Sequence, residues 1–141
     1  MDRTYRDRTL WDLAVPTSSD SRSPRILPLC YQVAQSANVL GICDGAANVG
    51  QIAHAVGVSL TNVDKARISR TTAVPAAPKP HLEIAENAKK NIVINGCGNR
   101  CASKVLQNAR RKIDYEMDTS KYLKKVPTLD VYQADVKKIA G

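Results

Sequence analysis

The chain of 141 residues has no phenylalanine, one tryptophan and only two histidines. No apolar run approaches the ~20 residues that a membrane-spanning helix requires, so we expect no membrane insertion. The sequence also lacks a G-x-x-x-x-G-K-[ST] loop, the spacing of a Ser–His–Asp triad and a pair of carboxylates at a plausible site. These are signatures of nucleotide-hydrolysing and acid–base enzymes. We therefore expect a protein that binds rather than one that catalyses.

The amino terminus lacks the apolar stretch of a secretory signal, because residues 1–8 are strongly charged. We accordingly expect a cytoplasmic protein. Glutathione and thioredoxin keep thiols reduced in the cytosol, so disulfides are rare there. The four cysteines of the chain are therefore expected to bind metal or to do redox chemistry.

Length and composition fit one compact domain, with 43% hydrophobic residues to form a core. Residues 1–25 contain the Ser- and Pro-rich stretch Pro16–Pro24, which cannot bury apolar surface and reads as a linker. We expect residues 1–25 to be a flexible extension that could hold a partner through Trp11. The folded domain is expected to span residues 26–141.

Basic residues exceed acidic ones by eight, and most of this excess lies in the second half of the chain. Residues 88–113 have seven basic side chains and no acidic one: Lys89, Lys90, Arg100, Lys104, Arg110, Arg111 and Lys112. Such a block is either a solvated helix surface or a docking face for an anionic partner. Aromatic residues are scarce beside it, so single-stranded nucleic acid is the partner that we rank last.

Apolar patterns with the period of strands alternate along the chain with patterns typical of helices. We expect Asn48 to cap the first helix, and the prolines between Pro75 and Pro80 to end the extended piece before them. Strands are expected at residues 37–42, 66–74, 91–95 and 113–117, and helices at 49–60, 81–90, 101–111 and 130–140. Gly50 and Gly57 weaken the first of these helices unless another backbone packs closely against it.

This alternation predicts an α/β fold: a single domain with a small, mostly parallel sheet flanked by helices. Ligands of such sheets collect at the carboxyl ends of the strands. Cys43 follows the first expected strand, and Cys97 and Cys101 follow the strand at 91–95. We therefore expect these three thiols at one edge of the sheet.

Cys97 and Cys101 are four residues apart, so they share a face if both lie in the first turn of a helix. The positive end of that helix, together with Arg100 and Lys104, favours the thiolate, which is the form that binds metal. A third thiolate from Cys43 would repel the other two unless a cation lay among them. The alternative for each cysteine is a buried structural role.

A metal at this edge would take sulfur ligands, with zinc preferred and an iron–sulfur cluster second. Cys30 is the favoured fourth ligand, although it could equally be a small core residue. His54 and His81 are weaker alternatives, because a solvated or hydrogen-bonded histidine is the more common finding at such positions.

Two segments, Cys43–Gln51 (CDGAANVGQ) and Ile94–Cys101 (INGCGNRC), resemble the DGC-domain family of predicted zinc-binding proteins. The resemblance extends over roughly Leu27 to Leu129. The family is named after an Asp-Gly-Cys triplet, which Asn95, Gly96 and Cys97 match here. The resemblance implies a four-cysteine metal site to which Cys43, Cys97 and Cys101 belong. We expect Asn95, Gly96 and Arg100 of the same loop to contact the cofactor.

This sequence departs from the family pattern at two places. Asn95 replaces the usual aspartate, and no cysteine lies between Cys43 and Cys97, although the family pattern leads us to expect one near residues 67–70. Three explanations remain open: Cys30 substitutes, the site is three-coordinate and open, or metal binding has been lost.

The favoured function is a metal-binding cysteine-cluster module with a regulatory or redox-sensing role. One alternative is an accessory subunit that docks onto a larger enzyme complex through residues 1–25 or 88–113 and has a degenerate metal site. The other is a small thiol enzyme or sulfur carrier that uses Cys97 or Cys101 as its nucleophile.

Overall fold

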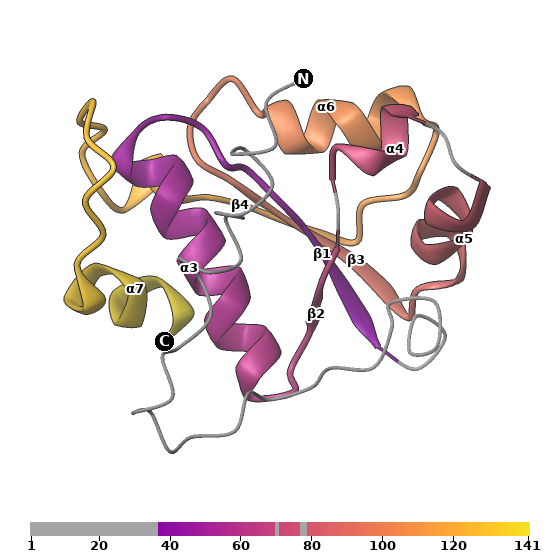
Figure 1. Ribbon diagram of the computed structural model, residues 1–141, viewed down its shortest axis with the longest axis horizontal. Coiled ribbons are helices and arrows are strands. Elements are labelled where there is room, and N and C mark those ends of the chain that lie inside the picture. The colour runs from indigo at the N-terminus through magenta and orange to yellow at the C-terminus, as the bar shows by residue number, and fades with distance from the viewer. Residues whose placement is uncertain (1–36, 70, 77–78) are drawn as a thin grey trace, which may run out of the picture.

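The computed structural model describes residues 37–69, 71–76 and 79–141 (Figure 1). The predicted extension at residues 1–25 and Cys30 both lie outside this part. The described elements are, in chain order, β1 (Asn38–Ile42), α3 (Asn48–Asn62), β2 (Arg67–Ile68), α4 (Ala73–Ala76), α5 (Lys79–Asn87), β3 (Lys90–Asn95), α6 (Cys101–Asn108), β4 (Tyr115–Asp118), the short 3-10 helix η2 (Thr119–Lys121) and α7 (Gln133–Ala140).

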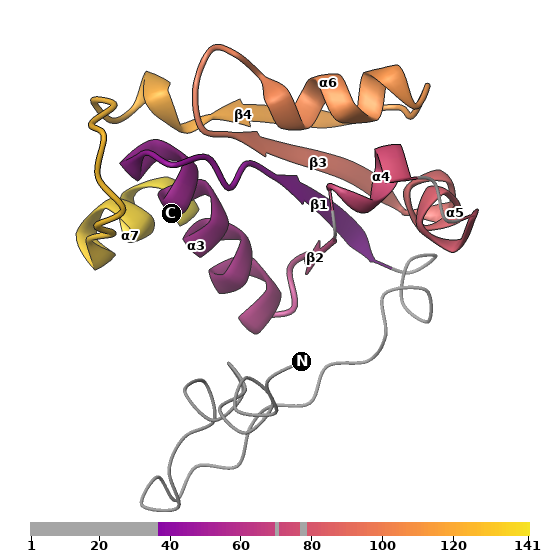
Figure 2. The same cartoon turned by 45° about the horizontal axis from the view of Figure 1, so that its top comes forward.

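The four strands form one sheet in the order β2-β1-β3-β4, and each neighbouring pair is parallel. Figure 2 shows α6 on one face of this sheet and α3 with α7 on the other. The predicted α/β class, with a parallel sheet flanked by helices, is confirmed. Because β2 and β3 lie on opposite sides of β1, the order reverses between β1 and β3. Parallel sheets bind ligands at such a switch point.

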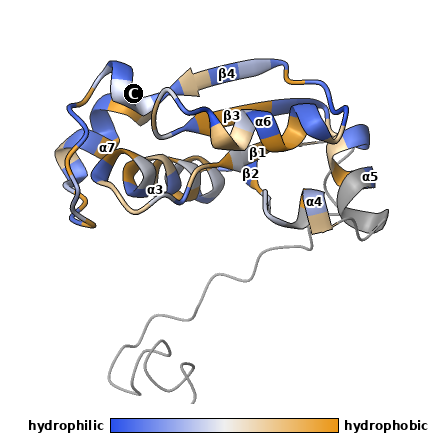
Figure 3. Ribbon diagram, turned by 90° about the horizontal axis from the view of Figure 1, so that it is seen from above, coloured by the Kyte–Doolittle hydropathy of each residue, from blue (hydrophilic) through white to orange (hydrophobic). Residues whose placement is uncertain are grey.

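Strand residues alternate between the two helical layers, because successive side chains of a strand point to opposite faces. Leu40, Ile42 and Ile94 belong to the core that α3 and α7 cover, and Val93 packs with Leu106 of α6. Apolar colour runs along β1 and β3, while β4 at the edge is mostly polar (Figure 3). The core is thus centred on the two strands that carry the cysteine loops.

Close packing explains both glycines of α3, but only Gly50 meets the expected condition of a nearby backbone, because Gly57 packs against side chains. A β-carbon on Gly50 would lie 2.6 Å from the carbonyl oxygen of Gly45, and one on Gly57 would collide with Ile42. The prediction that Asn48 caps this helix is wrong. Ala47 is at the cap position and forms no side-chain capping bond, while Asn48 is the first helical residue.

The prediction of an extended segment at 66–74 holds only for Arg67–Ile68, because Ala73–Ala76 is helical. Pro75 and Pro80 do not stand between elements as expected but lie inside α4 and α5. Both are among the first four residues of their helix, whose N–H groups have no intrahelical partner, so a proline there removes no hydrogen bond. The remaining predicted elements are present with shifted ends. No helix in the described part of the chain is long and apolar enough to cross a membrane.

Candidate functional site

The three described cysteines follow the carboxyl ends of β1 and β3, on either side of the switch point. Cys43 comes directly after β1, and its backbone N–H donates to the Ile94 carbonyl at 3.0 Å, which extends the β1–β3 pairing by one residue. Cys97 lies in the loop after β3, and Cys101 is the first residue of α6. Their predicted placement along one edge of the sheet follows from this topology.

Gly96 brings the loops after β1 and β3 into direct contact. A β-carbon on Gly96 would lie 2.8 Å from the Gly50 α-carbon and 3.2 Å from the Cys43 sulfur. Any larger residue would therefore meet backbone on one side and the thiol on the other. The sulfur of Cys43 thus lies against the residue that immediately precedes Cys97.

A cleft of about 740 Å³ opens at this edge, and both Cys43 and Cys101 line it. Its walls also include Asp44, His54 and Arg67, together with hydroxyl side chains after β2. The structure therefore brings together two thiols that are far apart in the sequence. Cys97 is not part of the cleft wall and faces a different neighbour.

Hydrogen-bond donors contact two of the thiols. The Cys43 sulfur accepts a hydrogen bond from the Gly45 N–H at 3.4 Å, and the Cys97 sulfur accepts one from the Lys125 ammonium at 3.7 Å. Cys101 is exposed, and all three cysteines are free of disulfides. Cys43 is partly buried against the core that contains Leu40 and Ile42, whereas Cys101 reaches solvent.

Asn48 holds the segment that carries Lys125. Its side-chain amide donates to the Lys124 carbonyl at 2.9 Å, and its side-chain oxygen accepts from the Val126 N–H at 2.7 Å. The backbone N–H of Asn48 also donates to the Val126 carbonyl at 3.1 Å. Asn48 therefore fixes both neighbours of Lys125. Sequence reasoning missed this contact, because the partners are 76 residues apart.

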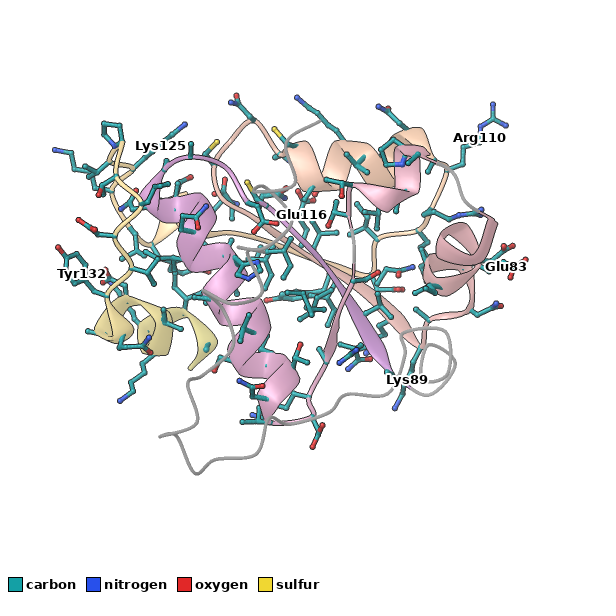
Figure 4. The ribbon with its side chains drawn as sticks, in the orientation of Figure 1. Glu83, Lys89, Arg110, Glu116, Lys125 and Tyr132 are labelled. Atoms are coloured by element: carbon teal, nitrogen blue, oxygen red, sulfur yellow. The ribbon has the colours of Figure 1, made fainter. Side chains whose placement is uncertain are left out.

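A polar network braces the loop between β3 and α6. Asn95 and Ser103 are fully buried, and both donate to the Glu116 carboxylate, at 2.9 and 2.8 Å. Arg100 donates to both oxygens of the same carboxylate, with 2.6 Å between Nη2 and Oε2. The hydrogen bond from Arg100 is the main cause that lowers the pKa of Glu116. Figure 4 labels Glu116 within the sheet layer below α6.

The three residues predicted to contact a cofactor make contacts with the protein itself. Asn95 binds Ser103 and Glu116, Gly96 packs against Gly50, and Arg100 pairs with Glu116. Glu116 is a member of the site that sequence reasoning missed. Glu116 is connected to this loop through the pairing of β4 with β3, in which it lies opposite Val93.

Within the described ranges, no group of three or more His, Cys, Asp or Glu residues is placed so that it could hold a metal ion. Thiols are suitable zinc ligands, but too few of the described ones lie close enough together to bind the same ion. His54 lies on the cleft wall with Nδ1 2.8 Å from the Asp44 carboxylate. Cys30 and the side chain of His81 are outside the description. The described residues alone therefore do not fit a complete zinc site.

Acidic side chains partly neutralise the basic block 88–113. Arg100 pairs with Glu116, Lys112 lies 2.8 Å from Asp114, and Arg111 lies 3.9 Å from Glu86. These contacts hold three of the seven basic side chains of the block against the protein surface. The block is therefore less available to an anionic partner than its composition indicates.

The family model of the DGC domain matches residues 39–141. No curated protein and no solved structure matches the chain. The matched range contains the three described cysteines and both loops of the switch point. It confirms the resemblance carried by the two sequence motifs. The chain belongs to the DGC-domain family.

Proposed function

We propose that the protein is a thiol-based module that senses metal or redox state through the cleft between β1 and α6. The observation that carries this proposal is that Cys43 and Cys101, which come from separate parts of the chain, line one cleft. If the two cysteines were only small core residues, there would be no reason for both to line the same solvent-accessible cleft.

In this proposal zinc is the metal, or an iron–sulfur cluster second, and the site is completed by a ligand from beyond the described residues. Cys30 is the candidate within the chain, and a partner protein could supply a ligand instead. Cys43 and Cys101 would be the two ligands from the cleft wall, and Cys97, which lies outside that wall, is a further candidate. Soft thiolate ligands suit both kinds of centre.

The test is elemental analysis of anaerobically purified full-length protein. We expect about one zinc per chain, and we expect the Cys43→Ser and Cys101→Ser variants to lose it. The Cys30→Ser variant shows whether Cys30 is the fourth ligand. Metal-free protein whose thiols all react freely with iodoacetamide contradicts the metal part of the proposal.

The redox part has a separate test. Hydrogen peroxide should oxidise two thiols to one disulfide, with transfer of two hydrogens to the peroxide and release of two waters. Mass spectrometry of the alkylated protein then shows two cysteines protected from iodoacetamide. Unchanged alkylation of Cys43, Cys97 and Cys101 after peroxide treatment contradicts redox sensing.

A second candidate function, docking onto a larger complex, is favoured by the segment between β4 and α7. Tyr122, Leu129 and Tyr132 are all more than half exposed there. Lys125 and Tyr132 project from this segment in Figure 4. Exposed tyrosines are typical of the centre of protein interfaces.

Three lysines between residues 121 and 125 make this segment basic, so we propose that an acidic face of a cytoplasmic protein complex docks on it. The Leu129→Asp and Tyr132→Ala variants should lose a large partner that co-purifies with the full-length protein. The Val63→Asp variant, at an equally exposed apolar residue on the end of α3, should keep that partner. Loss of the partner in all three variants, or in none, contradicts this surface.

A further inference from the structure

We propose that Glu116 is a positioning residue: it fixes the two thiols of the Cys97–Cys101 loop by holding Arg100 in a left-handed backbone conformation. The importance of this device rests on the proposed thiol function. Its operation can be measured without any metal or partner.

Arg100 has φ of 52° and ψ of 42° at the position that precedes α6. Residues other than glycine, asparagine and aspartate rarely adopt this region, because their β-carbon comes too close to the following carbonyl oxygen. The Arg100 N–H donates to the Cys97 carbonyl at 3.0 Å, and its own carbonyl accepts from the Lys104 N–H at 2.9 Å. Arg100 therefore both closes the turn after Cys97 and starts the helix at Cys101.

The unfavourable conformation of Arg100 is offset by its contact with β4. Its Nε and Nη2 atoms donate to the two oxygens of Glu116, which is a two-point geometry that a single lysine could not reproduce. The Glu116 side chain is 29% exposed and that of Arg100 is 46% exposed. This pair is thus partly shielded from water, which strengthens it relative to a fully exposed ion pair.

The same carboxylate also connects the two sides of the loop. Glu116 accepts from Asn95 at the end of β3 and from Ser103 in the first turn of α6. The Ser103 N–H in turn donates to the Asn95 side-chain oxygen at 3.2 Å. One carboxylate on β4 therefore fixes the last residue of β3, the residue before α6 and the first turn of α6.

The two cysteines lie at the ends of the segment that this network holds. If Arg100 relaxed to an ordinary negative φ, the start of α6 would turn relative to β3. Cys101 would then move along the wall that it shares with Cys43, and Cys97 would move away from Lys125. Cys43 follows β1, where its N–H is held by the Ile94 carbonyl inside the sheet, so its surroundings should change less than those of the other two.

The experiment measures the rate at which iodoacetamide alkylates each cysteine in the reduced full-length protein, resolved by mass spectrometry. In the Glu116→Ala variant we expect the rates at Cys97 and Cys101 to change by about fivefold, while the rate at Cys43 stays within about twofold. The matched control is Glu86→Gln, which removes the exposed partner of Arg111. It should leave all three rates unchanged.

Substitution of Arg100 separates positioning from general loosening of the fold. Glycine adopts positive φ without cost, whereas alanine does not. Arg100→Gly should keep rates close to wild type, and Arg100→Ala should reproduce the Glu116→Ala pattern. Adding Arg100→Gly to Glu116→Ala should bring the rates back toward wild type. A purely structural role for Glu116 would not be rescued by a glycine.

Two results overturn the proposal: unchanged rates at Cys97 and Cys101 in Glu116→Ala, or equal changes at all three cysteines. Equal rates in Arg100→Gly and Arg100→Ala overturn it as well, because backbone conformation would then be irrelevant. The proposed function fails on a different measurement, namely the metal content and peroxide sensitivity of the wild-type protein. The two failures can therefore be told apart.

Discussion

Gly96 and Gly50 pack backbone against backbone, with 2.8 Å between the position of a Gly96 β-carbon and the Gly50 α-carbon. This contact joins the loop after β3 to the first turn of α3. It also leaves the Cys43 sulfur beside the Gly96 backbone. The cysteine edge is therefore organised by glycines whose importance lies in close approach rather than in an unusual φ.

Substitution of Gly96 by alanine should destabilise the protein, because the new methyl group meets backbone that cannot move aside. We expect a loss of about 1–3 kcal/mol in the free energy of unfolding. Urea denaturation gives this value. The control is Gly98→Ala in the same loop, where an added β-carbon meets no atom within 4 Å. Equal stability of the two variants would show that the contact is not rigid.

Asn48→Ala should release the segment around Lys125, because it removes two side-chain hydrogen bonds to the backbone of residues 124 and 126. The expected cost is about 1–2 kcal/mol in the free energy of unfolding. Hydrogen exchange should accelerate at the Val126 amide in particular. Asn108→Ala, at an exposed helix position, serves as the control. Fast hydrogen exchange at the Val126 amide in the wild type would contradict its hydrogen bond to the Asn48 side chain.

Acid should weaken the protein partly through Glu116. Its pKa in the folded state is lowered, first by the hydrogen bond from Arg100 and further by Ser103. A lowered folded-state pKa stabilises the fold at pH values above the unfolded-state pKa of about 4.3, and this contribution is lost as the pH falls through the folded-state value. The Glu116→Gln variant should therefore lose less stability than wild type between pH 5 and pH 3. The urea midpoint as a function of pH provides the measurement, and parallel curves would contradict the assignment.

Asn95→Asp, which introduces the aspartate that the family resemblance leads us to expect, should be unfavourable in this chain. Asn95 is fully buried and donates to Glu116, so an aspartate would place two carboxylates in contact. We expect a loss of about 2–3 kcal/mol at neutral pH. The double variant with Glu116→Gln should recover part of this loss. Independent, additive effects in a double-mutant cycle would contradict the coupling.

The sequence predicted the parts of the fold that depend on local pattern. The apolar run at residues 91–95 became the central strand β3, and the run at 37–42 became β1 beside it. Their parallel pairing places the residues that follow both strands at one edge. Topology alone therefore sufficed to expect Cys43 near the loop of Cys97.

What could not be predicted depends on contacts between distant residues. Asn48 has the residue type and position of a helix cap, yet its side chain binds residues 124 and 126 instead. The prolines between Pro75 and Pro80 predict an interruption of secondary structure, although a proline fits the first turn of a helix equally well. Glu116 has no neighbouring motif, and its role appears only when β4 pairs with β3.

The strand order also determines when the cleft can exist during synthesis. Cys43 leaves the ribosome early, but its opposite wall is contributed by α6, and the brace of α6 is contributed by β4. Parallel pairing cannot begin until the crossover between two strands has been translated. A nascent chain that ends before β4 therefore presents its thiols without their final arrangement. The final arrangement of the cysteine edge therefore forms only after β4 has been translated and paired with β3.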